Sequence, residues 1–208
     1  MSLYPTVVGD IALKDLQAPE HVATLTSEHK FGGPIFDIYD DQIKFAAGDT
    51  ANRQYMTHDD AVAIVAVRPS GPSWEVLLIN QYRHAPRQLM WEVPAGLCDV
   101  PGEEKKRAAQ RELAEETGYA ANEWLELISF YASAGVSDEK VTVFLASDVS
   151  TGSNINFEKI EEEREITVHW VDIRKIVQAI FRGDLTSPAL VAGVLAANEY
   201  LQSQTFRP

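Results

Sequence analysis

The segment that most constrains this chain covers residues 96–119, in which a Pro-Gly turn leads into a run rich in glutamate. This pattern predicts a loop followed by a helix over residues 104–117, and Gly118 is well suited to a left-handed C-cap. Positions i, i+3 and i+4 of a helix share one face, and here they hold three carboxylates: Glu112, Glu115 and Glu116. Carboxylates this close repel one another, so we expect a positive charge beside them. Hard divalent cations such as Mg²⁺ bind carboxylate oxygens and bridge them to phosphates.

The order of residues within this segment carries further information. It reads Gly96-x6-Glu103-x7-Arg111-Glu112-Leu-x-Glu-Glu-x-Gly118-Tyr. From Glu103 onward this resembles the Nudix box, Gly-x5-Glu-x7-Arg-Glu-apolar-x-Glu-Glu-x-Gly-apolar, without a gap. The spacing between Gly96 and Glu103 is one residue longer, which a Pro-Gly turn in a loop easily absorbs. A solvated, glutamate-rich amphipathic helix is the alternative interpretation, and the complete pattern favours the family.

The resemblance implies both a fold and a chemistry. The fold is an α/β/α sandwich with a mixed β-sheet. The chemistry is hydrolysis of the pyrophosphate in a nucleoside diphosphate joined to another group, with Mg²⁺ as the expected cofactor and Mn²⁺ as the alternative. By position, the resemblance assigns the metal ligands and their neighbour: Glu112, Glu116 and the backbone carbonyl of Ala95, with Glu115 beside them. It also implies that Arg111 and Glu103 orient the loop and the helix through a salt bridge.

The residues before the box narrow the resemblance. Residues 91–96 read Trp-Glu-Val-Pro-Ala-Gly and residues 81–83 read Gln-Tyr-Arg, as in ADP-ribose pyrophosphatases, especially the actinobacterial type. That type implies cleavage of ADP-ribose into AMP and ribose 5-phosphate. The forked guanidinium of Arg83 is a candidate for gripping a phosphate, and a surface arginine at a strand end is the alternative. Ala134 stands where these enzymes commonly have a proline, so the exact substrate stays open.

Further site residues are expected outside the box. The family often takes a water-activating glutamate from another loop, and alignment to the subfamily places Glu163 at that general-base position. Glu162 and Glu165 are its substitutes, and a solvated acidic loop is the alternative interpretation for each of them. Glu139 or Ser133 is the candidate for contacting the terminal ribose.

Other functions compatible with this pattern stay open. One is a different nucleotide-sugar or dinucleotide pyrophosphatase, and another is a Nudix-like sensor that binds ADP-ribose without cleaving it. Sensors of that kind usually have a degraded box and an appended winged helix. Here the box acids are all present, and the chain after residue 172 is too short for such a domain. A housecleaning enzyme for oxidised nucleoside triphosphates fits less well, because the chain has an extra N-terminal unit.

The composition restricts the partners of this chain. A net charge of −13 over 208 residues argues against binding to a nucleic-acid backbone. The longest apolar run, residues 189–197, is far short of a membrane span, and no secretory signal is visible. The single cysteine, Cys98, excludes an intrachain disulfide and suits a reducing compartment. We therefore expect a cytoplasmic enzyme that acts on a small molecule, with neither nucleic acid nor membrane as a partner.

We expect two domains: an N-terminal β-strand domain, residues 1–57, for dimerisation and substrate contact, and a Nudix hydrolase domain, residues 58–208. The first predicts a small antiparallel sheet with strands over residues 21–29, 34–45 and 54–58. So small a sheet needs cover, and the subfamily exchanges this unit between subunits, so we expect a homodimer through the N-terminal domain. In the second domain the pattern predicts strands over residues 61–67, 74–82, 88–93, 124–131, 140–146 and 166–171, and helices over residues 104–117, 173–181 and 188–204.

Overall fold

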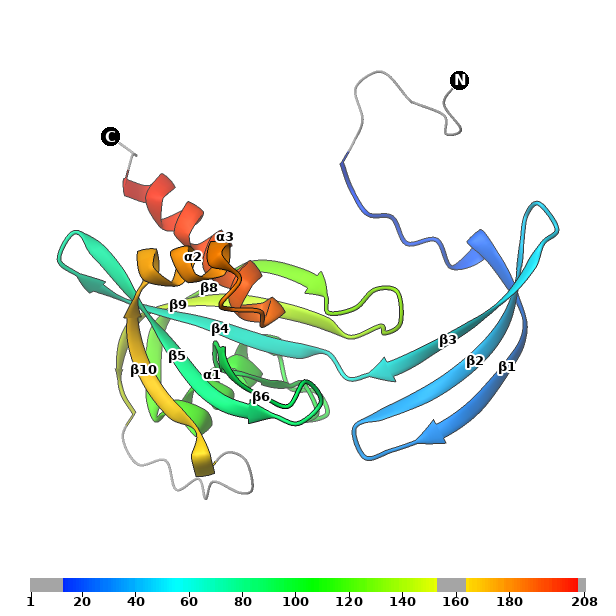
Figure 1. The fold of residues 1–208 in the computed structure, drawn as a ribbon, viewed down its shortest axis with the longest axis horizontal. Helices are drawn as coiled ribbons and strands as arrows, with labels where there is room; N and C mark the ends of the chain where they lie inside the picture. The colour runs from blue at the N-terminus through cyan, green and yellow to red at the C-terminus, as the bar shows by residue number, and fades with distance from the viewer. Residues whose placement is uncertain (1–12, 153–163, 206–208) are drawn as a thin grey trace.

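A computed structural model describes residues 13–152 and 164–205 of the chain (Figure 1). Two β-sheets make up most of it, and helices pack against the larger one. Across the described residues, no helix is long and apolar enough to cross a membrane. The predicted general base Glu163 and its substitute Glu162 lie outside the described residues.

The smaller sheet is N-terminal and antiparallel. In the described part of the chain it contains β1 (Val22–Gly32), β2 (Phe36–Phe45) and β3 (Thr50–His58), in that order, after a short 3₁₀ turn. At its centre Tyr39 is paired with His29 on one side and with Tyr55 on the other. Nearly every residue of β1 is exposed. The N-terminal sheet therefore buries little of its own surface within one chain.

The larger sheet follows the path β10-β5-β4-β9-β8, with β6 paired to β5 and β7 paired to β4. Strands β4 and β9 run parallel and the other pairs are antiparallel, so the sheet is mixed. Its strands are β4 (Ala61–Ser70), β5 (Ser73–Arg83), β6 (Gln88–Glu92), β7 (Ala95–Leu97), β8 (Tyr119–Tyr131), β9 (Lys140–Thr151) and β10 (Thr167–Asp172). The helices are α1 (Lys105–Thr117), α2 (Ile173–Arg182) and α3 (Pro188–Thr205).

Strand β4 shows how the layers form, because its residues alternate between two apolar clusters. Val62 and Ile64 pack with Leu113 of α1 on one face of the sheet. Val65 belongs to the cluster on the other face, which α2 and α3 cover (Figure 1). Gly193 lets α3 approach closely, because a Cβ atom there would lie 3.0 Å from the Val65 side chain. Helices on both faces of a mixed sheet confirm the predicted α/β/α sandwich.

Some segments differ from the sequence prediction. Strand β8 begins at Tyr119, before the predicted residue 124, and β9 continues to Thr151, past the predicted residue 146. These two strands pair along their whole length, so the ladder extends over polar residues that show no apolar alternation. In the N-terminal sheet, β3 likewise begins at Thr50, before the predicted residue 54. The sequence pattern does not predict β7, since three residues are too few to show a period.

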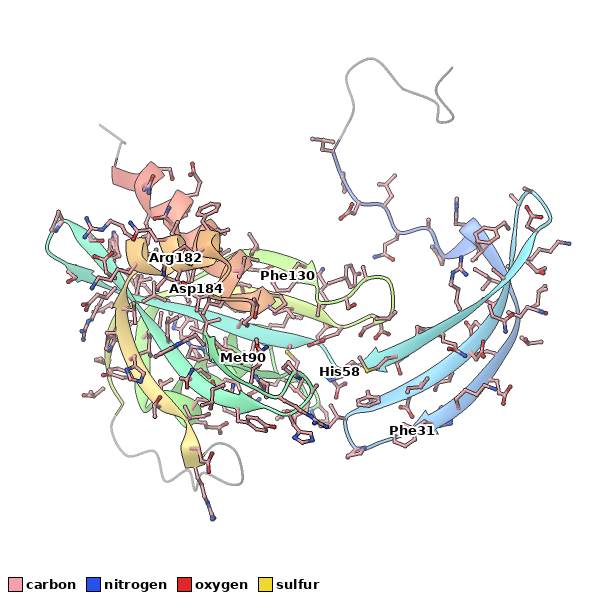
Figure 2. The ribbon with its side chains drawn as sticks, in the orientation of Figure 1. Phe31, His58, Met90, Phe130, Arg182 and Asp184 are labelled. Carbon is pink, nitrogen blue, oxygen red and sulfur yellow. The ribbon has the colours of Figure 1, made fainter. Side chains whose placement is uncertain are left out.

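The two sheets meet where β3 passes the loop between β8 and β9. The N–H of Met56 donates to the carbonyl of Val136 at 2.8 Å, and the N–H of Asp138 donates to the carbonyl of Met56 at 3.3 Å. The N–H of His58 donates to Oδ1 of Asp138 at 3.0 Å. His58 lies at this join, whereas Phe31 lies out on the N-terminal sheet (Figure 2). The division into domains at residues 57 and 58 stays a prediction, and the join places the N-terminal sheet beside the rest of the molecule (Figure 1).

Candidate active site

The acidic segment folds as a short strand, a loop and a helix against the larger sheet. Strand β7 pairs with the start of β4, so the backbone of residues 95–97 is fixed to the centre of the sheet. Helix α1 packs beside it and buries Leu113 against β4 and β9. The helix ends at Gly118, which has a φ of 73° and donates its N–H to the carbonyl of Ala114. This is the left-handed cap that the sequence predicts.

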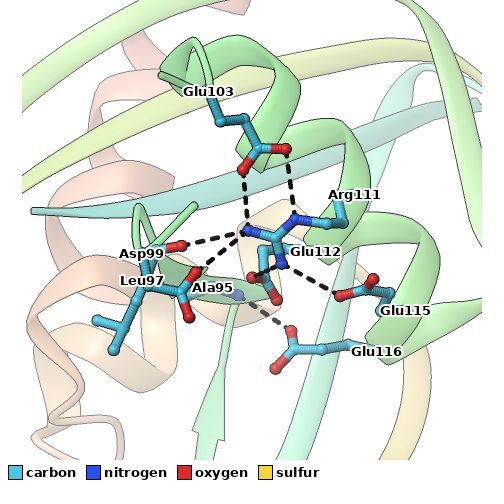
Figure 3. A network of polar contacts seen from close by, with 8 residues as sticks. All are labelled: Ala95, Leu97, Asp99, Glu103, Arg111, Glu112, Glu115 and Glu116. Carbon is cyan, nitrogen blue, oxygen red and sulfur yellow. Dashed lines mark hydrogen bonds and ion pairs between the residues drawn. The ribbon is translucent and has the colours of Figure 1, made fainter. Parts of the chain in front are cut away.

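Arg111 joins the loop to the helix through several carboxylates (Figure 3). Its Nη2 lies 3.1 Å from Oε2 of Glu103 and donates to the Leu97 carbonyl at 3.3 Å. Its Nη1 lies 2.5 Å from Oε1 of Glu112 and 3.2 Å from Oε2 of Glu115. Burial by itself would lower the pKa of Arg111, but the carboxylates of Glu103 and Glu112 outweigh it and raise the pKa. The arginine stays charged and holds the acidic loop against α1.

Glu112 lies directly against the backbone of Gly96. A Cβ atom on Gly96 would collide with the carboxyl group of Glu112. Glycine is therefore required at this position for a close approach, rather than for a left-handed turn. Burial raises the pKa of Glu112, although Arg111 acts in the opposite direction. The carboxylate is thus held in a place where its negative charge is poorly solvated.

Glu116 is the most deeply buried acid of this group. Its side chain accepts a hydrogen bond from the N–H of Ala95 at 3.0 Å, and the residue is only 8% exposed. Burial raises its pKa from an ordinary value of 4.5 to about 8, and the nearby carboxylate of Glu112 adds to the increase. Glu112 and Glu116 are one helical turn apart, so two poorly solvated carboxyl groups face the same loop.

The two carboxyl groups fit a divalent cation chemically. They offer hard oxygen ligands, and a cation would offset the cost of keeping both charged in a buried place. Within residues 13–152 and 164–205, no three His, Cys, Asp or Glu side chains gather closely enough to hold a metal ion by themselves. Backbone carbonyls, water and substrate oxygens would have to complete the coordination, which is typical of Mg²⁺ sites.

Arg83 lies at the edge of this acid pair and is held by Glu92. Its Nη2 lies 2.6 Å from Oε2 of Glu92, and its Nε lies 3.1 Å from Oε1. The amide of Gln81 also donates to Oε2 of Glu92, at 2.9 Å. The charge of Arg83 acts against the raised pKa of Glu116, so the guanidinium lies within electrostatic range of that carboxyl.

Sequence reasoning missed Glu92 as part of this group. The available signal was an acidic residue in a strand whose neighbours are apolar, since Glu92 is only 8% exposed. A buried carboxylate needs a partner of opposite charge. Its partner is Arg83 on the adjacent strand, which reaches it along the sheet although the strand register pairs Glu92 with Ile79.

The remaining predicted residues lie on other segments or outside the described residues. The structure brings together the predicted box residues, which are Ala95, Glu103, Arg111, Glu112, Glu115 and Glu116 (Figure 3). Glu139 is half-buried in the loop between β8 and β9, where its N–H donates to Oγ of Ser137 at 3.1 Å. Glu165 is exposed just before β10. The assignment of Glu163 as the general base stays a prediction.

The carboxylates are held by an arginine between a glycine loop and a helix, on an α/β/α sandwich, and this arrangement can bind a divalent cation that contacts phosphate oxygens. The NUDIX domain model matches residues 57–190 of the sequence. This chain belongs to the Nudix family, and it is a Nudix pyrophosphatase.

Comparisons with known proteins agree with this membership. The chain is 36% identical over 175 residues to an ADP-ribose pyrophosphatase of Mycobacterium tuberculosis, covering 84% of this chain and 82% of that one. It is 35% identical over 143 residues to an ADP-ribose pyrophosphatase of Bacillus subtilis, covering 69% of this chain and 71% of that one. The crystal structure of an ADP compounds hydrolase aligns with a TM-score of 0.77 at 22% identity, over 90% of this chain and 98% of that one. The first two relatives confirm the resemblance to ADP-ribose pyrophosphatases, and the third supports the fold.

Proposed function

We propose that this Nudix pyrophosphatase cleaves ADP-ribose into AMP and ribose 5-phosphate. The observation that carries the proposal is the pair of carboxyl groups of Glu112, which is partly buried, and Glu116, which is buried, held beside Gly96 and Ala95 of strand β7. The substrate is supported by the names of the two relatives from M. tuberculosis and B. subtilis.

In this proposal Glu112, Glu116 and the carbonyl of Ala95 hold Mg²⁺, with Mn²⁺ as the alternative. When bound, such an ion neutralises the charge that develops on phosphoryl oxygens and lowers the pKa of bound water. The chain itself supplies the geometry for this. The guanidinium of Arg111 offsets the negative charges of Glu103 and Glu115 and holds the side chain of Glu112 in place. Its nitrogen atoms lie 3.4 Å or less from the carboxylate oxygens of these three residues.

Arg83 is proposed to orient the pyrophosphate. A guanidinium can donate two parallel hydrogen bonds to phosphate oxygens. Glu92 fixes the plane of the Arg83 guanidinium by accepting hydrogen bonds from its Nε and Nη2. Gln81 in turn fixes Glu92. Binding energy used to orient the substrate in this way lowers the barrier, because the reacting groups no longer have to be ordered in the transition state.

Glu163 is the proposed general base, which takes the proton of the attacking water, with Glu162 and Glu165 as its substitutes. Glu139 is proposed to contact the terminal ribose. A base acts only within hydrogen-bond reach of its proton, directly or through one water. Separate Glu→Gln variants at the three base positions, compared by their pH–rate profiles, identify which of them loses the acidic limb of the profile.

We also propose that the protein is a homodimer through its N-terminal sheet. The exposed β1, and apolar side chains such as Leu25 and Phe31 that are 48% and 51% exposed, support this. Sedimentation velocity measures the mass directly. A mass of one chain at micromolar concentration would reject the dimer and leave the chemistry of the site unaffected.

The decisive experiment is product analysis by chromatography after incubation of the protein with Mg²⁺ and ADP-ribose. The wild type should form AMP and ribose 5-phosphate. Glu116→Gln should lose on the order of 10³-fold in kcat, because a metal ligand is removed while the shape of the side chain is kept. The control is Glu126→Gln, an exposed acid on β8, which should retain activity. Equal rates for the two variants would reject the site.

A second candidate is another nucleoside diphosphate sugar, since Ala134 replaces the usual proline of the ADP-ribose enzymes. The same assay with a panel of nucleotide sugars decides this. Turnover of another sugar nucleotide without turnover of ADP-ribose would assign the substrate differently and keep the site.

A further inference from the structure

We infer that Lys105 and Asp60 form a positioning pair that aligns the acidic loop with the start of α1 during catalysis. The inference rests on the proposed function, because it concerns the same metal-binding loop. It adds two residues to the site, neither of which is a specified residue of the box pattern.

Lys105 is an unexpected residue at its position. It is the first residue of α1, and the first turn of this helix contains no acidic residue. The N-terminus of a helix carries a partial positive charge and disfavours cations. The preceding residue, Glu104, forms no side-chain cap hydrogen bond. A lysine here weakens the helix on its own, as do the neighbouring cations Lys106 and Arg107, but Lys105 also forms a contact outside the helix.

The contact is with a carboxylate that lies directly before strand β4 of the larger sheet. Nζ of Lys105 lies 2.7 Å from Oδ2 of Asp60 and 3.3 Å from Oγ1 of Thr142. Thr142 is only 2% exposed and accepts a further hydrogen bond from Ser129 at 3.3 Å. The ammonium group is therefore tied both to the start of β4 and to the interior of β9.

Asp60 also holds the acidic loop through its backbone. Its carbonyl accepts a hydrogen bond from the N–H of Cys98 at 2.8 Å. The next residues of β4 pair with β7, where Val62 faces Gly96. One residue thus fixes the loop at Cys98 through its backbone and the start of the helix at Lys105 through its side chain.

The spacing between loop and helix has little tolerance. Gly96 and the carboxyl of Glu112 are so close that a single added carbon atom would collide. Arg111 connects the two segments through the Leu97 carbonyl and the Glu103 carboxylate. The Lys105–Asp60 pair adds a second connection, from the first residue of α1 to the residue that precedes β4.

The exposure of the Lys105–Asp60 pair favours a role in aligning the acidic loop over a role in folding stability. The side chains of Lys105 and Asp60 are 38% and 40% exposed. Ion pairs exposed to this extent add little to folding stability. Outer residues that orient metal ligands, in contrast, typically change metal affinity or activity by about 10–100-fold.

The test compares Lys105→Met with Lys106→Met, which removes the same charge from the exposed neighbour on the same helix turn. For each variant we would measure kcat, KM for ADP-ribose, the Mg²⁺ concentration for half-maximal rate, and Tm. Lys105→Met should raise the Mg²⁺ requirement and lower kcat by about tenfold each, with KM and Tm close to wild type. Lys105→Arg, which keeps the charge, should recover most of the loss. Asp60→Asn should reproduce the effect of Lys105→Met, and the double variant should be no worse than either single one.

Each other outcome overturns the inference. If Lys105→Met matches Lys106→Met in Mg²⁺ requirement and kcat, the pair does not position the site. If Lys105→Met lowers Tm and loses activity only in proportion to unfolded protein, the pair is merely structural. A wild type that cleaves no sugar nucleotide would instead reject the proposed function. The pair is then tested by the rise in Tm on adding Mg²⁺, which Lys105→Met should reduce and Lys106→Met should not.

Discussion

The larger sheet and the N-terminal sheet are both built from long strands, yet they bury their residues very differently. In β4 every residue from Ala61 to Val67 is buried, with an apolar cluster on each face. In β1 almost every residue is exposed. The larger sheet is covered by helices within the same chain, whereas the N-terminal sheet is not (Figure 1). A sheet is independently stable only when its apolar face is covered. The larger sheet has this cover within the chain, whereas the N-terminal sheet would need it from elsewhere.

The same contrast applies to their charges. In the N-terminal sheet, Asp37 lies 2.7 Å from His29, and both side chains are nearly half exposed. Beside the larger sheet, Glu116 is 8% exposed, and Glu112 is partly buried and packs against Gly96. Water can stabilise the first group of charges but not the second. The acids with raised pKa values therefore lie beside the sheet that helices cover, whereas the N-terminal sheet, which helices do not cover, keeps its charges in contact with water.

The largest expected effect is on folding, and it tests the comparison with one substitution in each region. Leu113→Ala should lower the free energy of unfolding by about 2–5 kcal/mol, because Leu113 is fully buried between α1 and the sheet. Leu25→Ala in β1 should change it by less than about 1 kcal/mol, because that side chain is 48% exposed. Urea unfolding followed by circular dichroism measures both, at a concentration below any self-association. Equal losses would mean that the N-terminal sheet is part of the same cooperative core.

The regions also differ in how much of them could be predicted from the sequence. The helix from Lys105 to Thr117 and the strand β4 follow from spacing and apolar runs, and both lie where the sequence places them. The acids of α1 follow from helical periodicity. The contact of Glu92 with Arg83 and that of Lys105 with Asp60 do not, because they depend on which strands and loops become neighbours in the fold. Local periodicity predicts elements, and only the tertiary arrangement shows which side chains meet.

A second prediction concerns the buried charge and is somewhat smaller. The pKa of Glu116 rises from 4.5 to about 8 on folding, so between these pH values the folded protein binds more protons than the unfolded protein. The contribution of the Glu116 carboxyl to the free energy of unfolding is therefore largest below pH 4.5. It falls as the pH rises toward 8. The loss should be on the order of a few kcal/mol without divalent cations.

Urea unfolding in a chelator at several pH values between 5 and 8 measures this loss. Glu116→Gln should flatten the dependence and make the metal-free protein more stable than wild type at pH 8. Glu126→Gln, which removes an exposed acid, should keep the wild-type slope. Unchanged slopes in both variants would show that Glu116 is not the group responsible.

A third prediction tests the close approach between the loop and α1. Gly96→Ala forces the carboxyl of Glu112 to move, because the new methyl group would collide with it. The Mg²⁺ concentration for half-maximal rate should rise by about 10–100-fold, as expected when a metal ligand is displaced. Gly135→Ala is the matched control, since a Cβ atom there has open space around it. If both variants bind Mg²⁺ as the wild type does, Glu112 is not a ligand.

The smallest expected effect is at the join between the two sheets. This prediction tests whether the two sheets open to solvent together or separately. Asp138→Ala removes the acceptor for the N–H of His58, which lies 3.0 Å from Oδ1. Global stability should fall by no more than about 1 kcal/mol, because water can replace an exposed acceptor. The amide of His58 should nevertheless exchange its hydrogen about fivefold faster or more, since local opening at the join no longer breaks this bond. Asp49→Ala, in the exposed turn between β2 and β3, is the control.

The extent of the faster exchange distinguishes two outcomes. Faster exchange throughout the larger sheet as well would mean that the join supports the whole fold. Faster exchange limited to the join and the N-terminal sheet would establish that sheet as a separately mobile unit.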